Sequence, residues 1–192
     1  EYFNVFFIGR VAEERKGLKY LLAAYSNLKR DFPKIRLIVG GSGVPNPSTY
    51  RLMGERVIED VMFLGSLSDE DLPGYYQYAD LFCAPNTGQE SFGMACVEAM
   101  AGGTPIVASD IPGFRTVIEN GKQGLLVPPK NENDLARAIS YLIEHPERRT
   151  HMSVNGQMLA RQYDWDIIAD KVYHYYERVL EKQPVPPSLY KG

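Results

Sequence analysis

The sequence predicts an α/β fold, a doubly wound parallel sheet of six strands with helices on both faces. Six short apolar runs alternate with segments whose apolar residues recur at helical spacing. This alternation is typical of parallel strands joined by helices. The runs are mainly apolar, as expected for the buried strands of a Rossmann-like parallel sheet. Ligands of such sheets bind outside the carboxyl ends of the strands, so the loops at that edge are the first candidates for a site.

The expected elements follow one another in short units. Strands are expected at Val5–Ile8, Ile35–Val39, Val61–Leu64, Leu81–Ala84, Ile106–Ala108 and Gly124–Val127. Helices are expected at Leu18–Leu28, Tyr50–Val57, Asp69–Tyr78, Phe92–Ala101, Phe114–Glu119, Glu132–Glu144, Arg148–Gln162 and Trp165–Lys182. Ser68 and Asp164 stand where N-caps are expected, and Gly102 stands where a helix would end.

The last expected helix carries an apolar stripe, formed by Ile168, Val172, Tyr175, Tyr176 and Val179. A stripe at this spacing predicts packing against the domain, with a partner or membrane role as the alternative. We expect residues 1–183 to form one domain. Residues 184–192 begin with Pro-Val-Pro-Pro-Ser and are expected to be a linker or a disordered tail. The chain starts with Glu-Tyr-Phe and a strand follows at once, so we expect a piece of a longer protein.

The charge, the cysteines and the apolar runs of the sequence argue against several classes of function. A net charge of -3 over 192 residues gives no general attraction for nucleic acid, so any anion site must be local. Cys83 and Cys96 belong to no metal or redox motif, and we expect two buried thiols in a reducing compartment and no metal site. The sequence contains no apolar run near 18 residues, the length that a spanning helix needs.

Cations follow the first expected strand. Arg10 leaves the strand at its carboxyl end, and Lys16 lies at the start of the next helix, just before Gly17. Two converging cations at this edge suit a diphosphate, because arginine offers a planar fork and lysine a point charge. A solvated basic loop is the alternative, and Arg15 is expected to be a surface charge.

Glycines follow the second expected strand, in the stretch Gly40–Gly43. Gly41 and Gly43 would let a ligand approach backbone N–H groups closely. The stretch fails as a dinucleotide fingerprint, because Asn46 stands where glycine or alanine is needed. A flexible turn is the alternative.

The strongest signal follows the fourth expected strand. Glu90 precedes a helix whose first turn is expected at Ser91–Met94, and the free N–H groups of such a turn form an anion site. Glu98 lies about two turns further on, next to Ala99 and Met100. Two carboxylates would repel phosphate, so they fit the hydroxyl groups of a sugar nucleotide instead. The alternative is a helix-start acid and a surface acid.

The order of these motifs resembles the GT-B glycosyltransferases of family 4. The resemblance rests on the spacing of Glu90 and Glu98 and on the pair Arg10 and Lys16. It also rests on Gly40–Gly43, Ser91-Phe92-Gly93, Phe63-Leu64-Gly65, Ala79-Asp80, Gly103–Ser109 and Gly124–Val127, and it runs from about Val5 to about Arg178. Cys83-Ala84-Pro85, Gly88–Gly93, Phe114-Arg115 and Tyr163-Asp164-Trp165 are most similar to phosphatidylinositol mannosyltransferases.

The resemblance implies the C-terminal, donor-binding domain of a retaining hexosyltransferase, without its N-terminal acceptor domain. Arg10 and Lys16 would neutralise the donor's diphosphate, and Glu90 would hold sugar hydroxyls. The backbone around Ser91, Phe92, Gly93 and Met94 would help Glu90, Glu98 would hold the ribose, and Leu67 and Asp69 would contact the base. Related mannosyltransferases use a lysine where this chain has Leu72, which leaves guanine selectivity open.

The resemblance also implies the ligands and partners. The donor would be a GDP-sugar or UDP-sugar, with mannose favoured as the sugar; Mg²⁺ could accompany the diphosphate, and no cofactor would be tightly bound. The acceptor would be phosphatidylinositol or another glycolipid, reached through the absent domain. The expected location is the cytoplasm, with peripheral contact at the inner face of the membrane left open. The piece alone is expected to bind nucleotide and to transfer no sugar.

Other functions remain open at this level. A sugar-nucleotide epimerase would bind similar ligands, although the spacing of Glu90 and Glu98 favours a transferase. A non-catalytic module would be expected to lose the charged residues that this chain keeps. An NAD-dependent oxidoreductase is disfavoured by the broken glycine fingerprint.

Overall fold

The computed structural model describes residues 2–44 and 60–181. Its strands are β1 Phe3–Ile8, β2 Ile35–Gly40, β3 Val61–Gly65, β4 Leu81–Ala84, β5 Ile106–Ser109 and β6 Gly124–Val127. They form one sheet in the order β3-β2-β1-β4-β5-β6, and every pair is parallel. The predicted fold class is confirmed. The strand order reverses between β1 and β4, the place where such sheets open a crevice for ligands.

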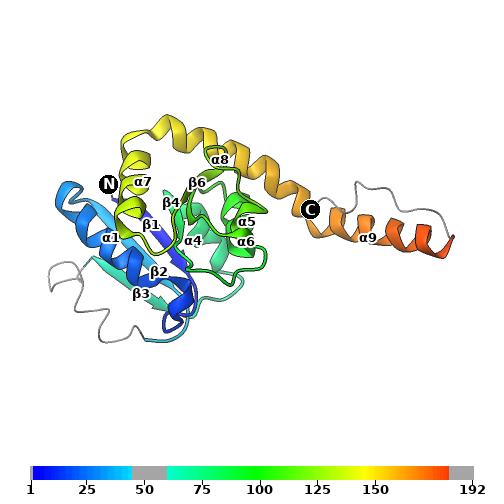
Figure 1. Ribbon diagram of the computed structural model, residues 1–192, viewed down its shortest axis with the longest axis horizontal. Coiled ribbons are helices and arrows are strands. Elements are labelled where there is room, and N and C mark those ends of the chain that lie inside the picture. The colour runs from blue at the N-terminus through cyan, green and yellow to red at the C-terminus, as the bar shows by residue number, and fades with distance from the viewer. Residues whose placement is uncertain (1, 45–59, 182–192) are drawn as a thin grey trace.

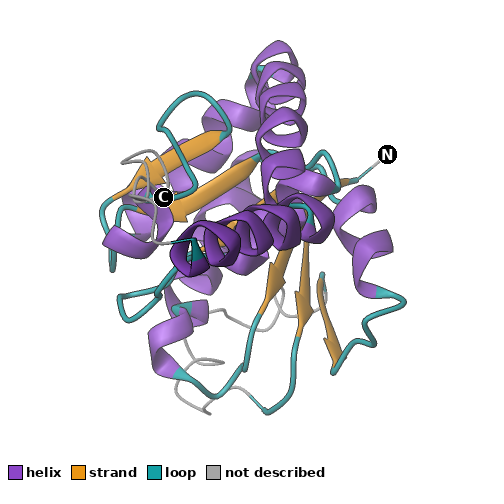
Figure 2. Ribbon diagram, turned by 90° about the vertical axis from the view of Figure 1, so that its right-hand side faces the viewer, coloured by secondary structure: helices purple, strands orange, loops and turns teal. Residues whose placement is uncertain are grey.

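Helices cover both faces of the sheet (Figure 1 and Figure 2). They are η1 Glu14–Lys16, α1 Leu18–Asp31, α4 Leu72–Tyr78, α5 Met94–Ala101, α6 Pro112–Arg115, α7 Glu132–Glu144, α8 Pro146–Ala160, η2 Arg161–Tyr163 and α9 Trp165–Leu180. The expected helix at Tyr50–Val57 lies outside the described residues. Each of the remaining expected helices has a counterpart.

The sheet separates two apolar cores. Side chains of successive strand residues point to opposite faces, so Val5 and Phe7 pack with α1 and α7. Phe6, between them, packs with α4, α5 and α6 on the other face. The site loops pack against both cores, since Val11 of the loop after β1 belongs to the first and Phe92 of the loop after β4 packs against the second. Cys83 and Cys96 are both buried, free thiols, as the sequence predicts.

Several helices begin later than their patterns indicate. The helix expected from Phe92 starts at Met94, because Gly93 adopts φ +94° and caps it. The helix expected from Asp69 starts at Leu72. Its N-cap is Asp71 and not the expected Ser68; Ser68 Oγ instead accepts from the N–H of Asp71 over 3.1 Å in the turn before the helix. Helix α6 starts early, at Pro112, because proline is suited to the first helical position.

Helix α9 departs most from expectation. It extends away from the sheet (Figure 1), and no residue of it is buried. Tyr176 is 61% exposed and Trp165 76% exposed, so the prediction that its stripe packs against the domain is wrong. Its predicted cap is correct, since Asp164 accepts from the N–H of Asp166 over 2.9 Å. None of the helices within the described ranges has the length and apolarity to cross a membrane.

Candidate functional site

Two loops meet at the carboxyl edge of the sheet, where the strand order reverses. One follows β1 and contains η1, and the other follows β4 and leads into α5. The N–H of Thr87 donates to the backbone oxygen of Arg15 over 2.8 Å. At Gly17, with φ +74°, an added Cβ would lie 1.9 Å from the backbone oxygen of Pro85. Only glycine therefore lets these loops come this close.

The carboxylate of Glu90 lies at the centre of this junction. Lys16 Nζ is 3.2 Å from Glu90 Oε2, and the two side chains are 22% and 20% exposed. Asn86 Nδ2 donates to the same oxygen over 3.0 Å, and Arg15 Nη1 lies 4.0 Å away. Donors from both loops thus converge on one carboxylate oxygen. Lys16 and Glu90, which the sequence predicts at one site, are in direct contact.

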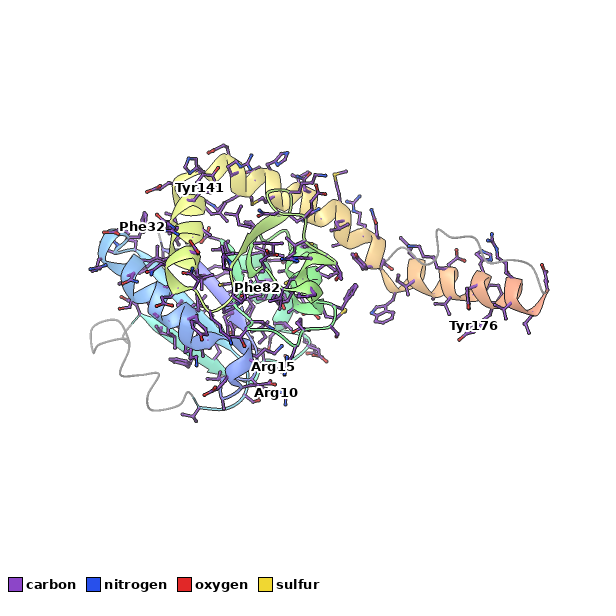
Figure 3. The ribbon with its side chains drawn as sticks, viewed as in Figure 1. Arg10, Arg15, Phe32, Phe82, Tyr141 and Tyr176 are labelled. Atoms are coloured by element: carbon purple, nitrogen blue, oxygen red, sulfur yellow. The ribbon has the colours of Figure 1, made fainter. Side chains whose placement is uncertain are left out.

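The basic stretch after β1 has an outer part and an inner part, which differ in exposure; Arg10 and Arg15 are labelled in Figure 3. Arg10 is the outer part, with a side chain 70% exposed that pairs with Glu13 over 3.2 Å. Arg15 belongs to the inner part, because it is 28% exposed and pairs with the same Glu13. It also donates to the backbone oxygen of Gln89 over 3.1 Å. The expectation that Arg15 is a surface charge is therefore wrong, since the loop after β4 folds over it.

Arg15 also steadies an unfavourable backbone conformation. Gln89, directly before Glu90, has φ +56°, a left-handed conformation that costs about 1–2 kcal/mol outside glycine. The bond from Arg15 to its carbonyl oxygen helps to offset that cost. Strain of this kind is concentrated at ligand sites, where the surrounding structure enforces it.

The glycines after β2 have a structural reason within the chain. At Gly41, with φ +124°, an added Cβ would lie 1.9 Å from the backbone oxygen of Gly9. The N–H of Gly41 donates to the backbone oxygen of Gly65 over 2.7 Å. At Gly43, with φ +100°, an added Cβ would lie 3.3 Å from the backbone nitrogen of Ala12. These glycines draw the loops after β1, β2 and β3 together at the predicted edge.

The base-contacting residues predicted after β3 fall in two places. Leu67 packs over the end of β2, since its Cδ1 would lie 2.8 Å from a Cβ added at Gly40. Asp69 lines a pocket between α4 and α5 that also contains Glu98. The structure therefore places Leu67 near the glycine loop and Asp69 nearer to Glu98.

Helix α5 begins at Met94, four residues after Glu90. The N–H groups of Met94 and Ala95 precede the first backbone hydrogen bond of the helix, which Cys96 donates to Gly93 over 2.9 Å. Ser91 to Gly93 therefore lie before the helix instead of forming its first turn, which corrects the prediction. Unpaired N–H groups at a helix start attract anions. Met94 is consequently the predicted residue best placed for that role.

The loop before α5 is held from behind by α6. An added Cβ at Gly113 would lie 2.0 Å from the backbone oxygen of Glu90. Thr116 Oγ1 donates to the backbone oxygen of Phe92 over 3.2 Å, and the ring of Phe92 meets Tyr163 edge-on at 5.4 Å. Helix α6 with its C-cap residue Thr116, and Tyr163 of η2, thus fix the path of the loop that carries Glu90.

Glu98 occupies a different environment, on the exposed side of α5. Its Oε2 accepts from the hydroxyl of Tyr76 over 2.9 Å. Burial, and then the negative charge of Glu98, raises the pKa of Tyr76 above its usual range, so the phenol remains a protonated donor. Both residues line a cavity of about 430 Å³, together with Asp69, Leu72, Pro73, Gln77, Ala101 and Gly102.

Sequence reasoning missed two side chains that contact the predicted carboxylates. Asn86 is 4% exposed and directly follows the fourth strand, so its place among the strand-end loops was a usable signal. Tyr76 offered no such signal, because an aromatic residue in an amphipathic helix is normally interpreted as part of the hydrophobic core. The described residues contain no cluster of His, Cys, Asp and Glu able to hold a metal ion.

The geometry can now be compared with known proteins. The model of the family described as "Glycosyl transferases group 1" matches residues 1–158. This chain belongs to the group 1 glycosyl transferases. The phosphatidyl-myo-inositol mannosyltransferase of Mycobacterium leprae is 38% identical over 176 residues, which cover 92% of this chain and 46% of that protein. The group 1 chain therefore spans about half the length of that relative.

Solved structures support the same membership. The sucrose-phosphate synthase of Thermosynechococcus elongatus superposes on this group 1 chain with a TM-score of 0.81 and 30% identity, covering 95% of this chain and 47% of that one. The Anabaena protein HepE, solved in complex with UDP, gives a TM-score of 0.79 and 26% identity, covering 92% and 49%. The GT-B likeness expected from the motifs is confirmed.

Proposed function

We propose that this group 1 chain is the donor-binding half of a retaining hexosyltransferase, and that its site holds a nucleoside-diphosphate sugar. The contact of 3.2 Å between Lys16 and Glu90 carries the proposal. It joins a phosphate-binding cation to a hydroxyl-binding carboxylate at the start of a helix, and these are the groups that the two ends of a diphosphate–sugar bond require.

Lys16 can serve both partners at once. An ammonium group has three N–H donors, so the one directed at Glu90 leaves others for a phosphate oxygen. The N–H of Met94 would meet the same diphosphate along the axis of α5, where the helix dipole favours negative charge. Arg10, exposed at the rim, would reach the diphosphate only after leaving Glu13.

The chemistry follows from where charge develops. In a retaining transfer the bond between the anomeric carbon and the phosphate oxygen breaks, and negative charge grows on the leaving diphosphate. Lys16, Arg10 and the start of α5 would stabilise that charge, and one such donor is typically worth about 3–4 kcal/mol in the transition state. Glu90 would hold sugar hydroxyls beside the breaking bond, in a front-face route in which the leaving phosphate helps to deprotonate the acceptor.

The relatives favour particular substrates. The relative named phosphatidyl-myo-inositol mannosyltransferase supports a mannose donor and a phosphatidylinositol or related glycolipid acceptor. The UDP in the HepE structure supports a nucleoside diphosphate as the carrier of the sugar, either GDP or UDP. Mg²⁺ could accompany the diphosphate. The acceptor would bind to a second domain, which the longer relatives have room for.

Nucleotide titration of the 192-residue chain tests this proposal. By calorimetry, we expect UDP or GDP to bind about tenfold more tightly than the matching monophosphate, because the second phosphate gains a charge-assisted contact with Lys16. ADP serves as the comparison for base selectivity. The proposal fails if none of these diphosphates binds, or if mono- and diphosphates bind equally. With GDP-mannose and phosphatidylinositol vesicles, we expect the chain alone to transfer no sugar.

A further inference from the structure

We propose that Tyr76 is a positioning residue, whose hydroxyl fixes the Glu98 carboxylate in the orientation that receives the donor's ribose. This inference rests on the proposed function, because it concerns how the nucleotide is held. The starting observation is the hydrogen bond of 2.9 Å from the Tyr76 hydroxyl to Glu98 Oε2.

The ring of Tyr76 cannot move freely. It is 2% exposed and meets Phe6 of β1 edge-on at 5.4 Å and Phe82 of β4 edge-on at 5.3 Å. These two strands flank the point where the strand order reverses. The hydroxyl is therefore carried on a ring that is locked to the centre of the sheet, although it emerges beside an exposed carboxylate.

The backbone of Tyr76 is equally constrained. Thr104 Oγ1 donates to its carbonyl oxygen, and a Cβ added at Gly102 would lie 3.0 Å from the Tyr76 Cβ. Helix α4 is thus seated closely on the end of α5. Because Glu98 belongs to α5, the donor and the acceptor of the hydrogen bond sit on two elements in fixed contact.

Glu98 needs such an anchor. Glu98 is exposed, and an unrestrained glutamate side chain samples many rotamers, whose loss on ligand binding costs conformational entropy. A carboxylate has about four acceptor positions; the Tyr76 hydroxyl uses one, which leaves the others for ligand hydroxyls. The adjoining cavity of about 430 Å³ provides room for a sugar ring.

A neutral partner suits this task better than a cation. A lysine or arginine at this place would compensate the charge of Glu98 and compete for its lone pairs. A phenol orients the carboxylate and leaves its full charge for hydroxyl donors, which bind ionised acceptors more strongly than neutral ones. The raised pKa of Tyr76 keeps that phenol protonated.

Tyr76→Phe tests the hydroxyl alone, because it preserves the ring and its packing. Calorimetry would measure UDP, GDP and their 2′,3′-dideoxy forms against wild type and variant. In wild type, we expect the dideoxy form of the bound nucleotide to be weaker, since Glu98 loses its partners. In Tyr76→Phe, we expect the ribose form to weaken about three- to tenfold and the dideoxy form to remain unchanged.

Tyr75→Phe is the matched control, because Tyr75 lies in the same helix and stacks on Phe6 at 5.8 Å. It should leave both nucleotide forms unchanged. A merely structural role for Tyr76 would weaken ribose and dideoxy forms alike, and that result would overturn the inference, as would no change in either. A wild type that binds the diphosphate without distinguishing ribose from dideoxyribose overturns the inference while the proposed function stands. A wild type that binds no nucleotide overturns both.

Discussion

Glu90 and Glu98 differ in what holds them. Lys16 reaches Glu90 from the loop after β1, 74 positions away in sequence, and Asn86 reaches it from within the loop after β4 that carries Glu90 itself. A single neutral phenol, 22 positions away, reaches Glu98. The first carboxylate is part of an ionic junction whose cation can also serve an anionic ligand. The Glu98 carboxylate has no cation beside it in its contacts with the described residues, and the hydrogen bond from Tyr76 fixes only its orientation. In the proposed donor site, phosphate would therefore bind beside one carboxylate and hydroxyl groups beside the other.

Gly17→Ala should break the Glu90 side most severely. The added Cβ would overlap the backbone oxygen of Pro85 at 1.9 Å and would force the two loops apart. Left-handed strain and displaced backbone together should lower the free energy of unfolding by about 3 kcal/mol or more. Urea denaturation measures this loss.

Gly65→Ala separates the two causes of that loss. Gly65 has φ +71°, close to that of Gly17, but no atom lies within 4 Å of its added Cβ. Backbone strain alone should cost about 1–2 kcal/mol. Equal losses in the two variants would show that the contact between the loops is not what makes Gly17 necessary.

Lys16→Ala should weaken binding of UDP or GDP by about 1.5–3 kcal/mol, or roughly ten- to a hundredfold, because a charge-assisted contact is lost. Lys19→Ala changes the same residue type three positions on, where its ammonium lies over Tyr20 at 5.3 Å, and should leave affinity unchanged. The preference for ribose over dideoxyribose should survive in Lys16→Ala, because it belongs to the Glu98 side. Unaltered diphosphate affinity would remove the assignment of Lys16.

Alkaline pH should act on the Glu98 side. The folded pKa of Tyr76 is raised by burial and by Glu98, so the folded chain keeps a proton that the unfolded chain releases above about pH 10. Stability from this group is complete below that pH and declines as pH rises further. Tyr76→Phe should make the decline shallower by about 1.4 kcal/mol per pH unit. Urea denaturation from pH 8 to 11 measures the slopes, and identical slopes would contradict this account.

The sheet could be predicted from local pattern because each strand is a short, mainly apolar run, and such runs favour burial in a parallel sheet. The edge strand β3 is equally apolar in sequence, although most of its residues are exposed or half-buried. The placing of Lys16 and Glu90 at one edge could be predicted for a related reason, because parallel strands bring all their carboxyl ends to the same edge. Their direct contact could not, because the sequence pattern does not say which of the loops at that edge touch.

The wrong predictions have a different cause: the sequence of a segment does not tell which other part of the chain will pack over it. Arg15 reads as a surface charge because nothing near it in sequence indicates that the loop after β4 will fold over it. The stripe of α9 shows one apolar face, but the pattern is silent on whether this domain buries it. The helix start at Met94 was misplaced because Gly93 looks compatible with a helix until its positive φ is known.

The two buried thiols can report local unfolding of the protein through their reactivity. Cys83 lies in central strand β4 and Cys96 in α5 beneath Glu90. Burial raises the pKa of both thiols, and Glu90 adds to this effect at Cys96, so neither is accessible or ionised in the closed fold. A thiol reagent can reach them only when their element opens. The labelling rate of Cys96 would report local opening of α5, and that of Cys83 would report unfolding of the sheet. A ligand that stabilises only the site should therefore lower the labelling rate of Cys96 more than that of Cys83.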